Sequence, residues 1–213
     1  MAKKSKKIQS VDSLLAGVER LYIQVMIGIV PPVFLLLAGW WGSLYFVPEE
    51  AVKFFALGGL LLGLFLDILF MRRWLRKAYT LPAGWFAAVY LFYSAGLFGF
   101  FMGVPVFNAL LGIMGGYYVG ICLRFAQKDK AEVEIAARRT ALFAAGMLAA
   151  VCAASWTIAY LDPSTAANIN GMFHLSRPIS RENILLFSAF AGVGLAALEY
   201  FITRATVKFA RFM

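Results

Sequence analysis

Charged residues are scarce in this chain. Only 15% of its 213 residues are Asp, Glu, Lys or Arg, whereas 62% are hydrophobic and the mean hydropathy is +0.78. A soluble domain is typically about one quarter charged and about half apolar. The composition therefore argues against a soluble domain.

Histidine and cysteine are also scarce. The chain has one histidine, His174, and two cysteines, Cys122 and Cys152, both within apolar segments. Without a Cys/His cluster, a zinc or haem site and a disulfide framework are disfavoured. The chain also lacks a Gly-x-x-x-x-Gly-Lys phosphate loop, a His-Glu-x-x-His helix and a Gly-x-Ser-x-Gly elbow. We therefore expect no metal and no cofactor, and an enzyme is the less favoured class.

The apolar residues gather in runs of about 20, the length that crosses a hydrocarbon core of roughly 30 Å as a helix. The alternation typical of membrane β-strands is absent, which leaves helices. The sequence thus predicts an all-α integral membrane protein, a bundle of six transmembrane helices. The predicted spans are residues 21–46, 52–71, 83–102, 106–124, 140–161 and 184–203. Pro31 and Pro32 are expected to kink the first span.

The basic residues are distributed unevenly between the two sides of this topology. Of the 20 Lys and Arg, 17 fall in the N-terminal segment, the second and fourth loops and the tail. The positive-inside rule then predicts that both termini are cytoplasmic, in a multi-pass protein of the cell (inner or plasma) membrane. The net charge of +9 reflects these span ends, so we expect no nucleic-acid partner.

The chain is expected to have one membrane domain, residues 21–204. Residues 1–20 form a basic cytoplasmic segment with an amphipathic lead-in, and residues 205–213 form a basic cytoplasmic tail. The lipid bilayer is the expected partner, and four lysines of the first segment are placed to contact anionic lipids. These are Lys3, Lys4, Lys6 and Lys7.

Small residues recur at four-residue spacing in several spans, which aligns them on one helix face. Such faces let helix backbones approach closely in lipid. The residues assigned to helix packing are Gly59, Gly63, Gly112, Gly116, Gly120, Ala145 and Ala149. We expect them to pack helices within the chain, against a second copy or against a partner subunit.

Two of the glycine stripes end in a charge. Asp67 follows Gly59 and Gly63, and Arg124 follows Gly120 at the same spacing. With Glu199, these groups are expected near the cytoplasmic side. Our hypothesis is that Asp67 pairs with Arg124 and that Glu199 lines an adjacent polar cavity.

A further polar residue, Asn108, is expected near the outer start of the fourth span. It is either a pathway residue or a hydrogen-bonding contact between helices.

Three functional interpretations follow. The ionisable groups within apolar spans favour a small-solute or ion transporter or channel. The scarcity of catalytic motifs equally suits a non-catalytic subunit or assembly factor of a larger membrane complex. A membrane enzyme acting on a lipid head group is the third and least favoured. The sequence does not name a substrate.

Overall fold

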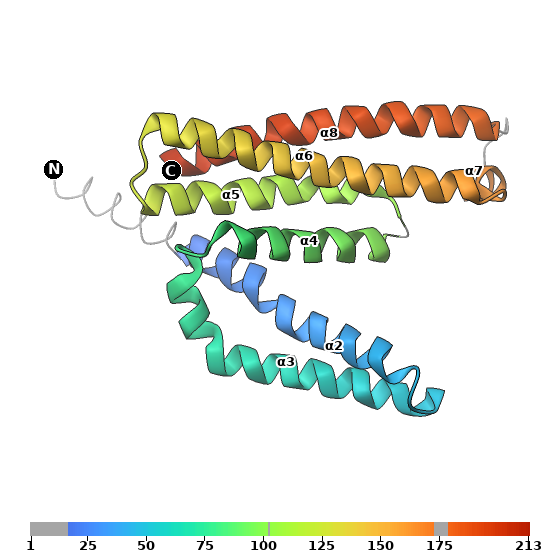
Figure 1. Ribbon diagram of the computed structural model, residues 1–213, viewed down its shortest axis with the longest axis horizontal. Coiled ribbons are helices and arrows are strands. Elements are labelled where there is room, and N and C mark those ends of the chain that lie inside the picture. The colour runs from blue at the N-terminus through green and yellow to red at the C-terminus, as the bar shows by residue number, and fades with distance from the viewer. Residues whose placement is uncertain (1–16, 102, 173–178) are drawn as a thin grey trace, which may run out of the picture. The chain divides into compact units, whose positions relative to one another are not determined.

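The computed structural model describes residues 17–101, 103–172 and 179–213 (Figure 1). Within these ranges every regular element is a helix, and six helical segments are long and apolar enough to cross a membrane. The prediction of an all-helical chain with six apolar helices is confirmed. The four N-terminal lysines assigned to lipid contact, and most of the amphipathic lead-in, lie outside the described residues.

A first helical segment covers residues 17–28. The elements that follow are α2 (Val30–Ser43), α3 (Glu49–Ala78), α4 (Ala83–Phe100), the 3₁₀ helix η1 (Pro105–Ala109), α5 (Leu110–Phe125), α6 (Lys130–Leu161), α7 (Thr165–Met172) and α8 (Arg181–Phe212). Residues 17–28 lead into α2, and η1 leads into α5, so that each pair forms one apolar segment.

Several helices are longer than the predicted spans. Helices α3, α6 and α8 have 30, 32 and 32 residues. The basic segment 72–77, which the sequence analysis places in the second loop, forms the last turns of α3, and most of the expected tail belongs to α8. Arg and Lys are good helix formers, so the helices continue past the end of their apolar part.

The described residues divide after Pro82 into two compact units, whereas one membrane domain over residues 21–204 was expected. The first unit is a helical hairpin in which α2 packs antiparallel against α3. Gly39 lies against the backbone at Phe55, and Gly59 lies against the backbone at Leu35. At these contacts no side chain separates the two helices, and the backbones touch directly.

The break predicted in the first span is present in this unit. Ile29 interrupts the helix just before Pro31 and Pro32, and Gly63 of α3 packs on the backbone of these two prolines. A proline ring cannot donate a backbone hydrogen bond and clashes with the preceding turn, which accounts for the interruption.

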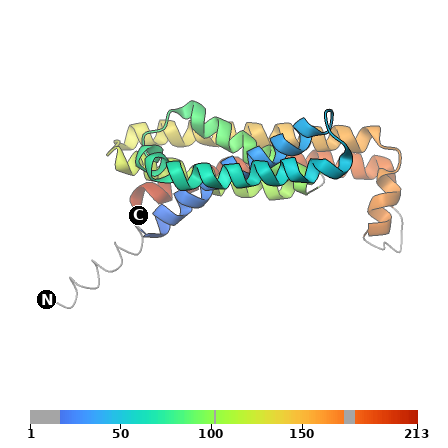
Figure 2. The ribbon, with the colours of Figure 1, turned by 90° about the horizontal axis from the view of Figure 1, so that it is seen from below.

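The second unit is a bundle of α4, α5, α6 and α8. Helix α8 packs along both α5 and α6, and Figure 1 shows these three running side by side. Helix α4 joins through aromatic rings. Phe86 stacks on Tyr118 of α5 with ring centroids 5.9 Å apart, and Tyr90 meets the edge of Phe143 of α6 at 5.3 Å. The short α7 turns away from the long axis of α6 (Figure 2).

Candidate functional site

The glycine stripe of α5 is covered by α8. A Cβ atom on Gly116 would meet the backbone at Thr203, and one on Gly120 would meet Ala210 and the backbone at Val207. The close helix packing expected of this stripe is present, and the partner is a helix of the same chain. This face is therefore an internal packing surface and is not free to contact a second copy.

Gly112, the first glycine of this stripe, leaves space for the Glu199 carboxylate. A Cβ atom at this position would overlap the Glu199 carboxyl group and the Thr203 hydroxyl. Glu199 and Thr203 both have an exposed fraction of 0%. A residue with no side chain on α5 is thus the reason that a glutamate of α8 can lie in the interior of the bundle.

Within the described residues, only one oxygen of the Glu199 carboxylate has a hydrogen-bond partner. The Tyr90 hydroxyl of α4 donates to Oε1 at 3.0 Å, and the Gly112 backbone is also hydrogen-bonded to this carboxylate. Within the described residues, the buried Oε2 atom and the Thr203 Oγ1 atom have no hydrogen-bond partner. Buried polar atoms are nearly always paired, so an unpaired carboxylate oxygen marks a place for a proton, a water or an ion.

Tyr90 is held in place by aromatic packing. Its ring lies against Phe86 and Phe143, and Gly115 of α5 leaves space for both Phe86 and Tyr90. Only 6% of Tyr90 is exposed. Because three helices fix the ring, the hydroxyl is presented to Glu199 in a set orientation.

A second polar contact lies one turn further along α4. The Asn108 amide of η1 donates to the Ser94 backbone oxygen at 2.9 Å and to its hydroxyl at 3.0 Å. Both residues are 2% exposed. Ser94 is four residues after Tyr90, so the two contacts share one face of α4. Asn108 therefore ties η1 to α4, as in the helix-contact alternative, while its Oδ1 atom is buried and unpaired among the described residues.

The register of α5 and α8 separates Glu199 from Arg124. The two helices run parallel, since Gly112 faces Glu199 and Gly120 faces Val207. Arg124 lies twelve residues after Gly112, which is roughly 18 Å along the helix. The expectation that these two groups share one depth does not hold, and Glu199 is enclosed by the bundle rather than lining an open cavity.

Asp67 belongs to the hairpin unit and Arg124 to the bundle unit, so their proposed pairing stays a prediction. Asp67 is half-buried, and its Oδ1 atom is buried without a hydrogen-bond partner in the part of the chain that is described. Its Oδ2 atom is 3.8 Å from where a Cβ on Gly28 would lie.

The alanine stripe of α6 is displaced by one position from the one expected. Ala145 is half-buried and Ala149 is exposed, whereas Ala141, Ala144 and Leu148 are buried. A spacing of three, then four, follows the 3.6-residue turn more closely than a strict spacing of four. On α6 the buried positions follow this mixed spacing, whereas on α5 the strictly spaced Gly112, Gly116 and Gly120 all stay buried.

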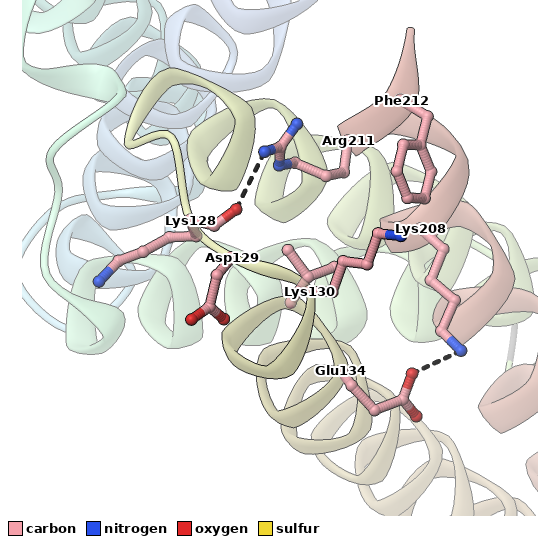
Figure 3. Close-up of a pocket in the computed structure, with 8 residues that line it drawn as sticks. Lys128, Asp129, Lys130, Glu134, Lys208, Arg211 and Phe212 are labelled. Carbon is pink, nitrogen blue, oxygen red and sulfur yellow. Dashed lines mark hydrogen bonds and ion pairs between the residues drawn. The ribbon is translucent and has the colours of Figure 1, made fainter.

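A groove of about 510 Å³ lies where α6 begins and α8 ends (Figure 3). Arg211 donates to the Lys128 carbonyl oxygen at 2.9 Å, and Lys208 pairs with Glu134 at 2.6 Å across it. Glu134 also pairs with Arg204. The lining residues are Lys128, Asp129, Lys130, Val133, Glu134, Lys208, Arg211 and Phe212. The groove carries four cationic groups against two carboxylates.

Sequence reasoning missed Tyr90, Ser94 and Thr203. The sequence pattern could have identified Thr203, because it follows Glu199 by four residues and therefore lies on the same helix face. Tyr90 and Ser94 show the same spacing on α4, but nothing in the sequence indicates that this face meets Glu199.

Among the described residues, no group of three or more His, Cys, Asp and Glu is placed to hold a metal ion. Cys122 and Cys152 are not joined in a disulfide. No protein-family model, curated protein or solved structure matches the chain.

Proposed function

We propose that this chain is a multi-pass membrane transporter or channel for protons or small cations, with Glu199 as the exchangeable group. One observation carries the proposal. Glu199 of α8 has no exposed surface, lies against α4 and α5, and has one carboxylate oxygen without a hydrogen-bond partner among the described residues. Ionisable groups at such positions typically mark ion pathways and proton relays.

A glutamate at position 199 has a cost that a glutamine would not have. An ionised acid inside a membrane helix costs roughly 2.5–3.5 kcal/mol on insertion scales. The Tyr90 hydroxyl needs only an acceptor, and a glutamine side chain would supply one without the charge. A carboxyl group adds the ability to release and regain a proton, and the vacant Oε2 atom is where a proton or a cation binds.

The membrane assignment rests on the six apolar helices, and its orientation rests on the Lys and Arg distribution. We place both termini in the cytoplasm, in a cell membrane, by the positive-inside rule. The start of α6 and the end of α8 would then face the cytoplasm, and the groove between them would lie at that surface.

The test is ion flux into proteoliposomes that contain the purified chain. An imposed gradient of protons, sodium or potassium is expected to drive uptake through the wild type, and Glu199→Gln is expected to reduce the rate at least tenfold. Glu182→Gln is the matched control, because Glu182 is an exposed acid in the first turn of the same helix. Wild-type flux in Glu199→Gln, or no flux of these ions through the wild type, overturns the proposal.

The alternative is a non-catalytic subunit of a larger membrane complex, and the groove of Figure 3 favours it. Its four cationic groups and the exposed Phe212 side chain form a surface suited to an acidic, partly apolar segment of a partner. Gentle extraction from the native membrane distinguishes the two. A stoichiometric second polypeptide whose binding is lost in Arg211→Ala supports the subunit, and a chain that purifies alone supports the transporter.

A further inference from the structure

The break in the first helix leaves two backbone carbonyl groups without their helical donors. Pro31 and Pro32 have no N–H, so they cannot donate to the residues four positions earlier, Ile27 and Gly28. On either side the ladder continues. Ile29 donates to Val25 at 3.2 Å, and Val33 donates to Ile29 at 3.3 Å. The loss is therefore confined to two consecutive carbonyl oxygens.

Helix α3 brings a carboxylate to this break. Gly63 lies on the backbone of the two prolines, where a Cβ atom would be 2.8 Å from the Pro31 carbonyl carbon and 2.6 Å from the Pro32 nitrogen. Asp67 follows Gly63 by one turn, and its Oδ2 atom is 3.8 Å from the Cβ position of Gly28. The close backbone contact at Gly63 thus sets this acid beside the interrupted turn, next to the Met71 methyl group, which is 2.7 Å from the same Gly28 position.

Within the described residues of the hairpin unit, Asp67 forms no ion pair with a cationic side chain. Its buried Oδ1 atom has no hydrogen-bond partner there either. The Asp67 carboxylate and the two donor-free carbonyl groups lie on facing turns of one apolar hairpin. A cation held between them would compensate the negative charge of the carboxylate. Backbone carbonyl groups that lack helical donors help to coordinate alkali ions within membranes.

We propose that the carboxylate of Asp67 and the carbonyl oxygens of Ile27 and Gly28 bind a monovalent alkali cation. The single negative charge of the Asp67 carboxylate favours a monovalent cation over a divalent one. One carboxylate neutralises one positive charge, whereas a divalent ion would leave a net charge in an apolar hairpin at high cost. Oxygen donors suit sodium and potassium ions, which are hard cations like those that carboxylates and carbonyls coordinate elsewhere. The site lies in the hairpin unit and is independent of Glu199 and of transport.

The first experiment measures cation-dependent thermal unfolding of the purified full-length chain in detergent, at constant ionic strength. Sodium or potassium chloride is expected to raise the unfolding midpoint saturably relative to choline chloride, because a ligand that binds only the folded state stabilises it. Asp67→Asn should abolish this shift. Glu50→Gln is the matched control, since Glu50 is an exposed acid in the first turn of α3, and it should keep the wild-type response.

A second variant tests the carbonyl half of the site. Changing Pro31 and Pro32 together to Ala restores both N–H donors while leaving Asp67 in place, and is expected to reduce the cation shift at least fivefold. Glu199→Gln should retain the full shift even if it eliminates flux, which separates this inference from the proposed function. The inference fails if alkali cations do not shift the wild type, if the double alanine variant responds normally, or if calcium or magnesium stabilises more than sodium and potassium.

Discussion

The hairpin unit and the bundle unit use the same small residue for different purposes. In the hairpin, Gly59 and Gly63 let α2 and α3 touch through their backbones. In the bundle, Gly112 admits the Glu199 carboxyl group, and Gly115 admits the Phe86 and Tyr90 rings. A glycine stripe in an apolar helix therefore indicates a close neighbour, but whether backbone or functional side chain fills the space depends on the facing helix.

The largest expected effect comes from filling a backbone contact in the hairpin. In Gly59→Ala the added methyl group would overlap the Leu35 carbonyl group, which cannot rotate away. We expect a loss of about 1–3 kcal/mol in the free energy of unfolding, the usual cost of overpacking. Reversible unfolding in mixed micelles measures it. The neighbouring Gly58 faces open space, so Gly58→Ala should be neutral or stabilising by up to about 1 kcal/mol.

A glycine-to-alanine change in the bundle, Gly112→Ala, can be compared directly with Gly59→Ala in the hairpin. In Gly112→Ala the methyl group meets side-chain atoms of Glu199 and Thr203, which have rotamers available. Its stability loss should therefore be smaller than that of Gly59→Ala, although the carboxylate will move away from Tyr90. An equal or larger loss would show that the bundle is as rigid as the hairpin at this point.

The next effect in size compares the buried Glu199 with the half-buried Asp67. Tyr90→Phe removes the hydroxyl that donates to Glu199, and we expect a loss of about 1 kcal/mol, as for other hydrogen bonds between membrane helices. Tyr45→Phe is the control, because Tyr45 is 86% exposed. Asp67→Asn, measured without alkali cations, should change stability less, since the buried Oδ1 of Asp67 has no hydrogen-bond partner to lose within the described residues. A larger loss for Asp67→Asn would reverse this comparison.

The smallest effect lies in the turn between α6 and α7. The hydroxyl and backbone N–H of Ser164 donate to the Asp162 carboxylate at 2.7 and 2.8 Å and hold its pKa below the ordinary value of 3.8. A lowered folded-state pKa means that the contact stabilises the turn above about pH 4 and is lost as the pH falls through the folded value. Hydrogen exchange should show greater protection of the Ser164 amide in wild type than in Asp162→Asn at pH 6. This difference should shrink towards pH 3, and a constant difference would contradict the assignment.

Much of the fold could be predicted from the sequence, because length and polarity define an apolar helix almost alone. The interruption at Pro31 and the close contacts of Gly59 and Gly120 also follow from local chemistry. The positions of the helix ends were harder to predict from the sequence. The basic residues 72–77 and the tail continue their helices, and composition does not distinguish a solvated helix from a loop.

The candidate site could be predicted only in part, since it depends on register between helices. Glu199 is conspicuous in the sequence, but its neighbours Tyr90 and Gly112 lie 109 and 87 positions away. Only packing reveals that α5 and α8 run parallel with Gly112 at the level of Glu199. The alanine stripe of α6 shows the same limit, because a one-residue shift in register moves the buried set from Ala145 to Ala144.

Helix α8 is unbroken from Arg181 to Phe212, so it is about 48 Å long at 1.5 Å per residue, well beyond a hydrocarbon core of roughly 30 Å. In its final turns, Lys208 pairs with Glu134 of α6, and Arg211 donates to the carbonyl oxygen of Lys128 in the loop before α6. A rigid helical fusion directly after Phe212 would inherit the direction of this helix instead of swinging on a linker. For a chain of 23.5 kDa, that provides an alignment marker for imaging single particles.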